Sequence, residues 1–119
     1  AQAYYKAQQL RTMLRQQVLD SLEKYDVLVL PTSGKGAQPR EEDPTVTSKE
    51  TAGRLAFLFT RIFNLASCPA MSVPCGFDHR NMPVGLQIGA RPGAEETIFK
   101  VAHAYEQATS WHTIRPPGA

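Results

Sequence analysis

Two apolar stretches separated by a turn decide the fold: AMSVP at residues 70–74 and VGLQIG at residues 84–89. Both are short, and the segment between them is rich in glycine, aspartate, asparagine and proline, the residues typical of turns. We therefore expect two strands that pair as a hairpin. Gly85 and Gly89 fall on the same side of the second strand, where a glycine usually marks the close approach of another backbone or of a ligand.

Helical periodicity lies on both sides of this hairpin. The first twenty or so residues carry apolar side chains at three- and four-residue intervals, which predicts a long amphipathic helix. Its apolar positions are Ala3, Ala7, Leu10, Leu14, Val18 and Leu22. TSKE at residues 47–50 fits a capping box, so a second helix is expected to follow, with an apolar stripe from Ala52 to Phe63. Glu95 and Glu96 are expected to begin a third helix, with an inward face that reaches Ala108.

VLVL at residues 27–30 is an apolar run without alternation, the pattern of a strand covered on both faces. Such a strand indicates a layered α/β protein of about three helices and three strands. The polar segment at about residues 32–47 contains glycine and proline and is long for a loop in a compact domain. It is either a surface excursion or a loop on the substrate side.

Composition narrows the functional classes. The 119 residues suit a single domain, and the apolar share of 42% and charged share of 20% indicate a folded chain. The net charge is +2 and basic residues alternate with acidic ones, which argues against nucleic-acid binding by this segment. No apolar run is long enough to cross a membrane, and no signal-peptide pattern is visible, so we expect a cytoplasmic protein with reduced thiols at Cys68 and Cys75.

The strands also carry a recognisable pattern. NLASCPAMSVPCG at residues 64–76 resembles the motif N-x-x-G-x-P-A-x-S-x-P-x-G of the amidase signature family, and MPVGLQIGA at residues 82–90 resembles the family's L-P-V-G-L-Q-hydrophobic run. The likeness extends over essentially the whole chain and matches the last quarter of the family's large α/β domain. It implies that residues 1–119 are one unit, the C-terminal portion of that mixed-sheet fold and an incomplete domain. Ser67 departs from the pattern, because the family usually has glycine there.

The resemblance implies hydrolysis of carboxylic amides through an acyl-enzyme. Members of the family use a serine nucleophile, a second serine and a lysine, with the serines in a Gly- and Ser-rich signature. This sequence contains no Gly-Gly and no Ser-Ser pair, so we assign no catalytic residue and expect the chain alone to be inactive. The similarity to the family is weaker between Thr32 and Asn64. The sequence therefore does not distinguish a general amidase from the A subunit of the glutamyl-tRNA amidotransferase.

Three polar residues are candidates for contact with the small amide substrate of the complete enzyme. Thr32 follows the C-terminal end of a strand, where open α/β sheets place ligands. Asn64 both donates and accepts, and Gln87 interrupts an apolar strand and needs partners if buried. Each is also explained by a structural hydrogen bond. Asp43, in the long loop, is a candidate anchor for a substrate ammonium or a solvated turn residue.

Other chemistry has weaker support. A cysteine–histidine site built from Cys68 or Cys75 lacks any spacing that places a histidine beside either thiol. The sequence offers no Cys-x-x-Cys or His-x-x-x-His pair for a metal, and no motif for a cofactor. The main competing interpretation is a non-catalytic binding or scaffold module that self-associates through open sheet edges.

Overall fold

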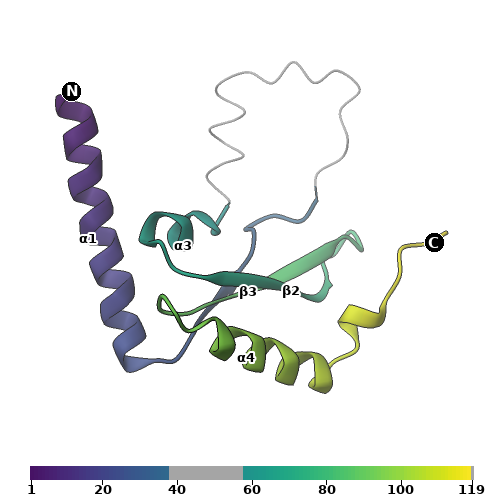
Figure 1. Cartoon of the computed structure of the whole chain (residues 1–119). Coiled ribbons are helices and arrows are strands. Elements are labelled where there is room, and N and C mark those ends of the chain that lie inside the picture. The colour runs from purple at the N-terminus through teal and green to yellow at the C-terminus, as the bar shows by residue number, and fades with distance from the viewer. Residues whose placement is uncertain (38–57, 119) are drawn as a thin grey trace, which may run out of the picture.

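The computed structural model describes residues 1–37 and 58–118, which form helices on both sides of a small sheet (Figure 1). The elements in chain order are α1 (Gln2–Lys24), β1 (Leu28–Pro31), α3 (Arg61–Ala66), β2 (Ala70–Phe77), β3 (Pro83–Gly89), α4 (Glu95–Ala108) and the short 3-10 helix η1 (Trp111–Thr113). The α/β class and the expected strands and outer helices are confirmed. The capping box at residues 47–50, Asp43 and most of the long loop lie outside the described residues.

The sheet has the strand order β1-β3-β2, and both pairings are antiparallel. The predicted hairpin is therefore present as β2 and β3, with Ser72 opposite Gln87. The register shifts between Pro74 and Gly76, so β2 carries an irregularity before the turn. A bulge of this kind bends a strand and strengthens its twist, which re-aims the end of the hairpin.

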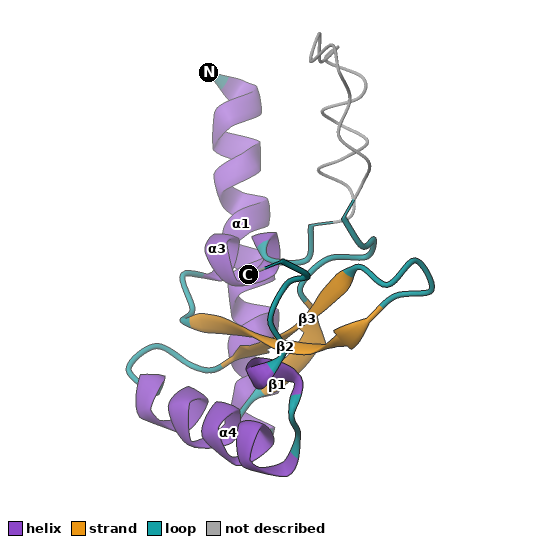
Figure 2. Ribbon diagram, turned by 90° about the vertical axis from the view of Figure 1, so that its right-hand side faces the viewer, coloured by secondary structure: helices purple, strands orange, loops and turns teal. Residues whose placement is uncertain are grey.

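Helix α4 covers one face of the sheet (Figure 2). Ile88 of β3 is fully buried there, and it packs with Val73 of β2 and with Ile98 and Ala102 of α4. Burying a side chain of this size stabilises a fold by about 1.5–3 kcal/mol. Ile98 and Ala102 belong to the predicted inward face of the helix, whereas Ala108, predicted to share it, is exposed.

The opposite face is covered at one end by α1 and α3. Val18 and Leu22 of α1 pack against Ala66 of α3. The ring of Phe63 lies directly on Gly89, where an added Cβ would overlap the ring atoms Cε1 and Cζ. Phe63 therefore approaches the strand closely at Gly89, as a glycine within a strand predicts.

Two arginines of α1 bind the end of α3. Arg11 Nε donates to the carbonyl of Leu65 at 2.9 Å and its Nη2 to Ser67 Oγ at 3.0 Å, while Arg15 donates to the carbonyl of Ala66. These carbonyls lie at a helix C-terminus, where they lack helical partners. Ser67 caps the helix with φ 53° and ψ 46°, the left-handed conformation that glycine adopts most easily. The glycine usual in the resembled family thus has a conformational reason.

Two expectations about burial were wrong. The strand expected to be covered on both faces is β1, which lies at an edge of the sheet with Val29 48% exposed. An apolar run predicts apolar surroundings for a strand, but it does not show which of the covering layers belong to this chain. Likewise the first half of α1 extends beyond α3, so Leu10 is 57% exposed although it lies on the predicted apolar stripe.

Candidate functional site

Three polar side chains and a glycine lie together on the face of the sheet opposite α4, next to the end of the sheet that α1 and α3 cover. It consists of Thr32, Ser72, Gly85 and Gln87, and we call it the polar sheet face. Side chains alternate along strands, so Gln87 and Gly85 share the face of Gly89 while Leu86 and Ile88 point toward α4. Ser72 is opposite Gln87, and the Thr32 amide donates to the Gly85 carbonyl at 2.9 Å, so three segments meet on this face.

A pair of hydroxyl groups forms one part of this face. Thr32 Oγ1 and Ser72 Oγ lie 2.5 Å apart across the sheet. A Cβ at Gly85 would lie 2.6 Å from Ser72 Oγ and 2.8 Å from Thr32 Oγ1. The absence of a side chain at Gly85 therefore leaves the space in which the two hydroxyls meet.

Gln87 is the second part, and its environment is unusual. The residue is only 2% exposed, and neither Oε1 nor Nε2 has a hydrogen-bond partner among the described residues. A buried polar group without a partner costs about 1–3 kcal/mol. Gln87 is one of the residues that line a cavity of about 270 Å³. The other residues lining it are Thr60, Phe63, Asn64, Cys68, Ala70, Met71 and Ser72.

The three candidate substrate residues lie around two neighbouring cavities. Gln87 and Asn64 line the first, and Thr32 lines a second cavity of about 400 Å³ together with Gly85. Ser72 lines both cavities and so connects them. Asn64 lies inside α3 and is exposed.

Ser72 is a further residue of this face that was not among the three candidates predicted from the sequence. The signal was available in the hairpin, because an antiparallel register that places Ser72 opposite Gln87 puts both side chains on one face. The turn alone did not fix that register, since β2 is irregular between Pro74 and Gly76.

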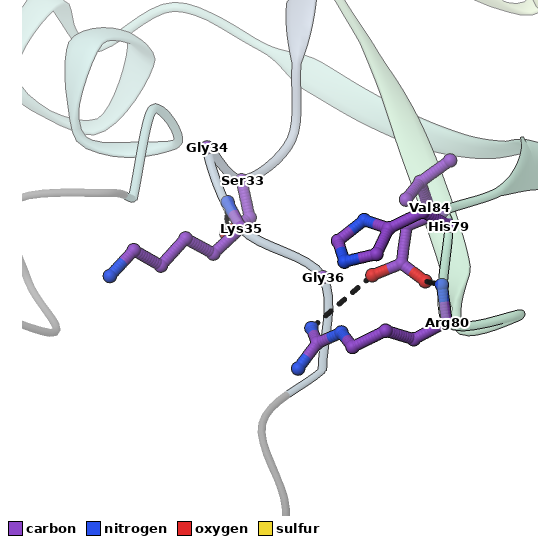
Figure 3. Close-up of a pocket in the computed structure, with 8 residues that line it drawn as sticks. Ser33, Gly34, Lys35, Gly36, His79, Arg80 and Val84 are labelled. Carbon is purple, nitrogen blue, oxygen red and sulfur yellow. Dashed lines mark hydrogen bonds and ion pairs between the residues drawn. The ribbon is translucent and has the colours of Figure 1, made fainter.

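A third cavity, of about 520 Å³, lies at the hairpin turn (Figure 3). Arg80 Nη2 donates to Asp78 Oδ2 at 3.2 Å and to the Ala37 carbonyl at 3.0 Å. Hydrogen bonds from the backbone amide of Met82, and then from the amide and guanidinium of Arg80, lower the pKa of the Asp78 carboxyl. The Lys35 side chain extends away from Arg80 in Figure 3, so the two cations do not converge on one point. This cluster therefore holds the turn against the segment after β1.

The environment of Cys68 does not activate its thiol as a nucleophile. Cys68 and Cys75 are free thiols, and their Sγ atoms lie 3.6 Å from the carbonyl oxygens of Ala66 and Val84. Burial raises the pKa of the Cys68 thiol, and the charge of Arg15 offsets only part of that effect. The thiol is therefore protonated near neutral pH, where a nucleophile must be a thiolate.

Two kinds of feature are absent from the described residues. In the chain segments 1–37 and 58–118, no three His, Cys, Asp or Glu side chains gather as metal ligands would. Within the same segments, no helix has the length and apolar character required to span a membrane.

Comparisons with known proteins agree with the sequence motifs. A family model described as Amidase matches residues 1–99. The chain is 42% identical over 116 residues to the A subunit of the glutamyl-tRNA(Gln) amidotransferase of Gloeothece citriformis (strain PCC 7424), a match that includes 97% of this chain and 23% of the relative. The chain thus spans about a quarter of the length of the curated relatives it matches.

Solved structures show the same partial coverage. The crystal structure of the glutamyl-tRNA(Gln) amidotransferase A subunit from Thermotoga maritima is similar with a TM-score of 0.76 and 33% identity, over 90% of this chain and 23% of that one. A 6-aminohexanoate cyclic dimer hydrolase is similar with a TM-score of 0.65 and 35% identity, over 78% of this chain and 21% of that one. The described elements therefore correspond to part of a larger fold.

Proposed function

This chain belongs to the amidase signature family, and on that premise we propose that it supplies one wall of an amide-hydrolysing site whose nucleophile comes from outside residues 1–119. The expected reaction is cleavage of a carboxylic amide through an acyl-enzyme on serine. In this proposal the chain contributes a sheet, the helices that cover it and a substrate-facing surface. We place the protein in the cytoplasm, in keeping with its two free thiols.

One observation carries the proposal: the family match extends over residues 1–99, and the polar sheet face lies within it. A sheet face with paired hydroxyls, a buried amide and an adjoining cavity is suited to hold a polar substrate group. The described residues provide no activated nucleophile beside it, since Cys68 is protonated and the hydroxyls of Thr32 and Ser72 are hydrogen-bonded to each other. Positioning is the role that these groups can perform.

We propose specific roles for the candidate substrate residues. Gln87 and Asn64 face the substrate from the smaller cavity, and Thr32 from the larger one. Ser72 joins this set because it lines both cavities and holds Thr32 in place. We propose that the substrate is a small molecule with an amide bond; one structural relative is named as a hydrolase of the 6-aminohexanoate cyclic dimer.

A chimera tests this proposal. The matching segment of the 6-aminohexanoate cyclic dimer hydrolase is replaced by residues 1–119, and hydrolysis of the cyclic dimer and of simple aliphatic and aromatic amides is measured. The control is the same hydrolase truncated before that segment. We expect the truncated hydrolase to be inactive and the chimera to hydrolyse at least one of these amides. A folded chimera that is as inactive as the truncated control would refute the proposal.

A scaffold function has one observation in its favour. The outer edges of β1 and β2 pair with no further strand among the described residues, and α1 exposes apolar side chains on its first half. These are Tyr4, Tyr5, Leu10 and Met13, each more than half exposed. Such surfaces favour association between copies. Sedimentation of the purified chain decides this point, because a stable monomer at high concentration excludes self-association.

A further inference from the structure

We propose that Asp78 and Arg80, in the turn between β2 and β3, are positioning residues for the larger cavity, the one that Thr32 lines. From the hairpin they hold the loop at residues 33–37, and this loop is one wall of that cavity. Neither Asp78 nor Arg80 lines the cavity, so both act through the loop. The inference rests on the proposed function, which assigns the cavity to the substrate, and it adds the residues that fix the cavity wall.

The loop at residues 33–37 lies between two cavities. Ser33, Lys35 and Gly36 line the cavity of about 400 Å³ beside Thr32, and the same three residues line the cavity of about 520 Å³ at the hairpin turn. In Figure 3 the guanidinium of Arg80 lies beside this loop at Gly36. A displacement of the loop would therefore change the width of the substrate cavity on that side.

The hairpin turn gives the carboxylate of Asp78 a fixed place. Asp78 Oδ1 accepts the backbone amide of Arg80 at 2.8 Å and that of Met82 at 2.9 Å. The amide of Asp78 donates in turn to the carbonyl of Met82 at 2.8 Å. Aspartate side chains commonly bind nearby backbone amides in turns in this way. The turn therefore orients the carboxylate so that Oδ2 can accept from the side chain of Arg80.

Arg80 connects this carboxylate to the loop. Its Nη2 donates to Asp78 Oδ2 at 3.2 Å and to the carbonyl of Ala37 at 3.0 Å. This nitrogen carries two hydrogens, and the rigid planar guanidinium directs them to two acceptors. The loop also approaches the turn closely, because a Cβ at Gly36 would overlap Asp78 Oδ2. The contact therefore fixes both the distance and the orientation of the loop relative to the hairpin.

A role in overall stability predicts a different behaviour from a positioning role. The side chains of Arg80 and Asp78 are 37% and 14% exposed, and ion pairs near the surface contribute little to the stability of a whole fold. The amide of Thr32 donates to the carbonyl of Gly85 at 2.9 Å, so the sheet anchors Thr32 without Arg80. Loss of the pair should therefore release the loop and leave Thr32 and α4 ordered.

The experiment measures backbone order parameters by ¹⁵N relaxation of the purified chain and of three variants. Arg80→Met removes the donors and keeps a long side chain. Asp78→Asn keeps an acceptor for the turn amides and removes the charge that orients Arg80. The control is Arg91→Met, the same change at an exposed position after β3. Thr32 and the amides of α4 show in each protein whether the rest of the fold is intact.

We expect order parameters near about 0.85 at Gly36 and Ala37 in the chain and in Arg91→Met, the value of a rigid backbone. They should fall below about 0.6 in Arg80→Met and in Asp78→Asn, the range of a flexible segment. The order parameters of Thr32 and of α4 should be the same in all four proteins.

The inference is overturned if Gly36 and Ala37 are already flexible in the unmodified chain, or if Arg80→Met or Asp78→Asn leaves them rigid. It is also overturned if Thr32 and α4 lose as much order as the loop, or if Arg91→Met has the same effect as Arg80→Met. These measurements need no turnover and are independent of the chimera. An inactive chimera together with a loop released in both variants would refute only the proposed function, and an active chimera with a rigid loop in both variants would refute only this inference.

Discussion

Replacing Gly89 with alanine tests the packing that connects α3 to the sheet. The added Cβ would overlap Cε1 and Cζ of Phe63 and lie 2.6 Å from Cδ1. Phe63 is 1% exposed, so neighbouring groups enclose most of its ring, although the residue also lines the cavity beside Gln87. The contact is also with a rigid ring rather than with the end of a flexible side chain. Residues 63 and 89 therefore cannot keep their present positions.

The magnitude follows from two opposing effects. Overpacking of a core usually costs about 1–3 kcal/mol, and contacts this short place Gly89→Ala near the upper limit. Alanine within a strand recovers about 0.5–1 kcal/mol relative to glycine, because the unfolded chain loses less freedom. We therefore expect a net loss of about 2 kcal/mol in the free energy of unfolding.

Urea unfolding of four proteins measures this effect: the chain, Gly89→Ala, Phe63→Leu and the double variant. Leucine removes the ring atoms that collide with the new Cβ, so Gly89→Ala should cost at least about 1 kcal/mol less in the Phe63→Leu background. Additive costs in the double variant, or a loss below about 0.5 kcal/mol for Gly89→Ala alone, would refute the packing argument.

Three further changes have definite expected outcomes. Ser67→Gly relieves a left-handed conformation that costs about 1–2 kcal/mol but removes the hydroxyl that Arg11 contacts, so thermal unfolding should show a net gain of about 0.5 kcal/mol, and a loss would contradict this account. The pKa of Asp78 in the folded state lies below its ordinary 3.8, so the stability that this carboxylate contributes is complete above pH 3.8 and is lost as the pH falls through the lowered pKa. Asp78→Asn should therefore flatten the acid-dependent part of a plot of the free energy of unfolding against pH. An unchanged plot would contradict this role of Asp78. Gly85→Ala should separate the Thr32 and Ser72 hydroxyls and lower the free energy of unfolding by about 1–2 kcal/mol, as measured by urea unfolding. A variant as stable as the parent chain would contradict this expectation.

The local elements were predictable because their signals are local. The hairpin of β2 and β3 is defined by two short apolar runs with turn residues between them, and α4 by acidic residues in its first turn and a 3.6-residue period. The close approaches at Gly85 and Gly89 also followed, since a strand tolerates glycine mainly where another group needs the space.

Features that depend on partners distant in sequence were not predictable. The apolar run of β1 gave no information about which layers cover Val29, and the stripe on α1 did not reveal that the helix passes α3 and leaves Leu10 exposed. The place of Ser72 depends on the register of the sheet, and the lack of a partner for Gln87 among the described residues depends on the three-dimensional structure. The recognised motifs did indicate most of the region, because they contain Ser72, Gly85 and Gln87 but not Thr32.

The polar sheet face contains one energetically costly residue. Gln87 is buried without a partner among the described residues, a costly state that is rare in native folds. Its neighbours Thr32 and Ser72 satisfy each other, so the face combines a hydroxyl pair with a buried amide that has no partner among the described residues.

The most direct test of the central claim, that this chain forms part of an amide-hydrolysing site without carrying its nucleophile, is ammonia release from acetamide and benzamide by the purified chain alone. The account predicts no release above the uncatalysed rate. Reproducible release that disappears in Cys68→Ser or Cys75→Ser would contradict it, because a nucleophile within residues 1–119 would then perform the reaction.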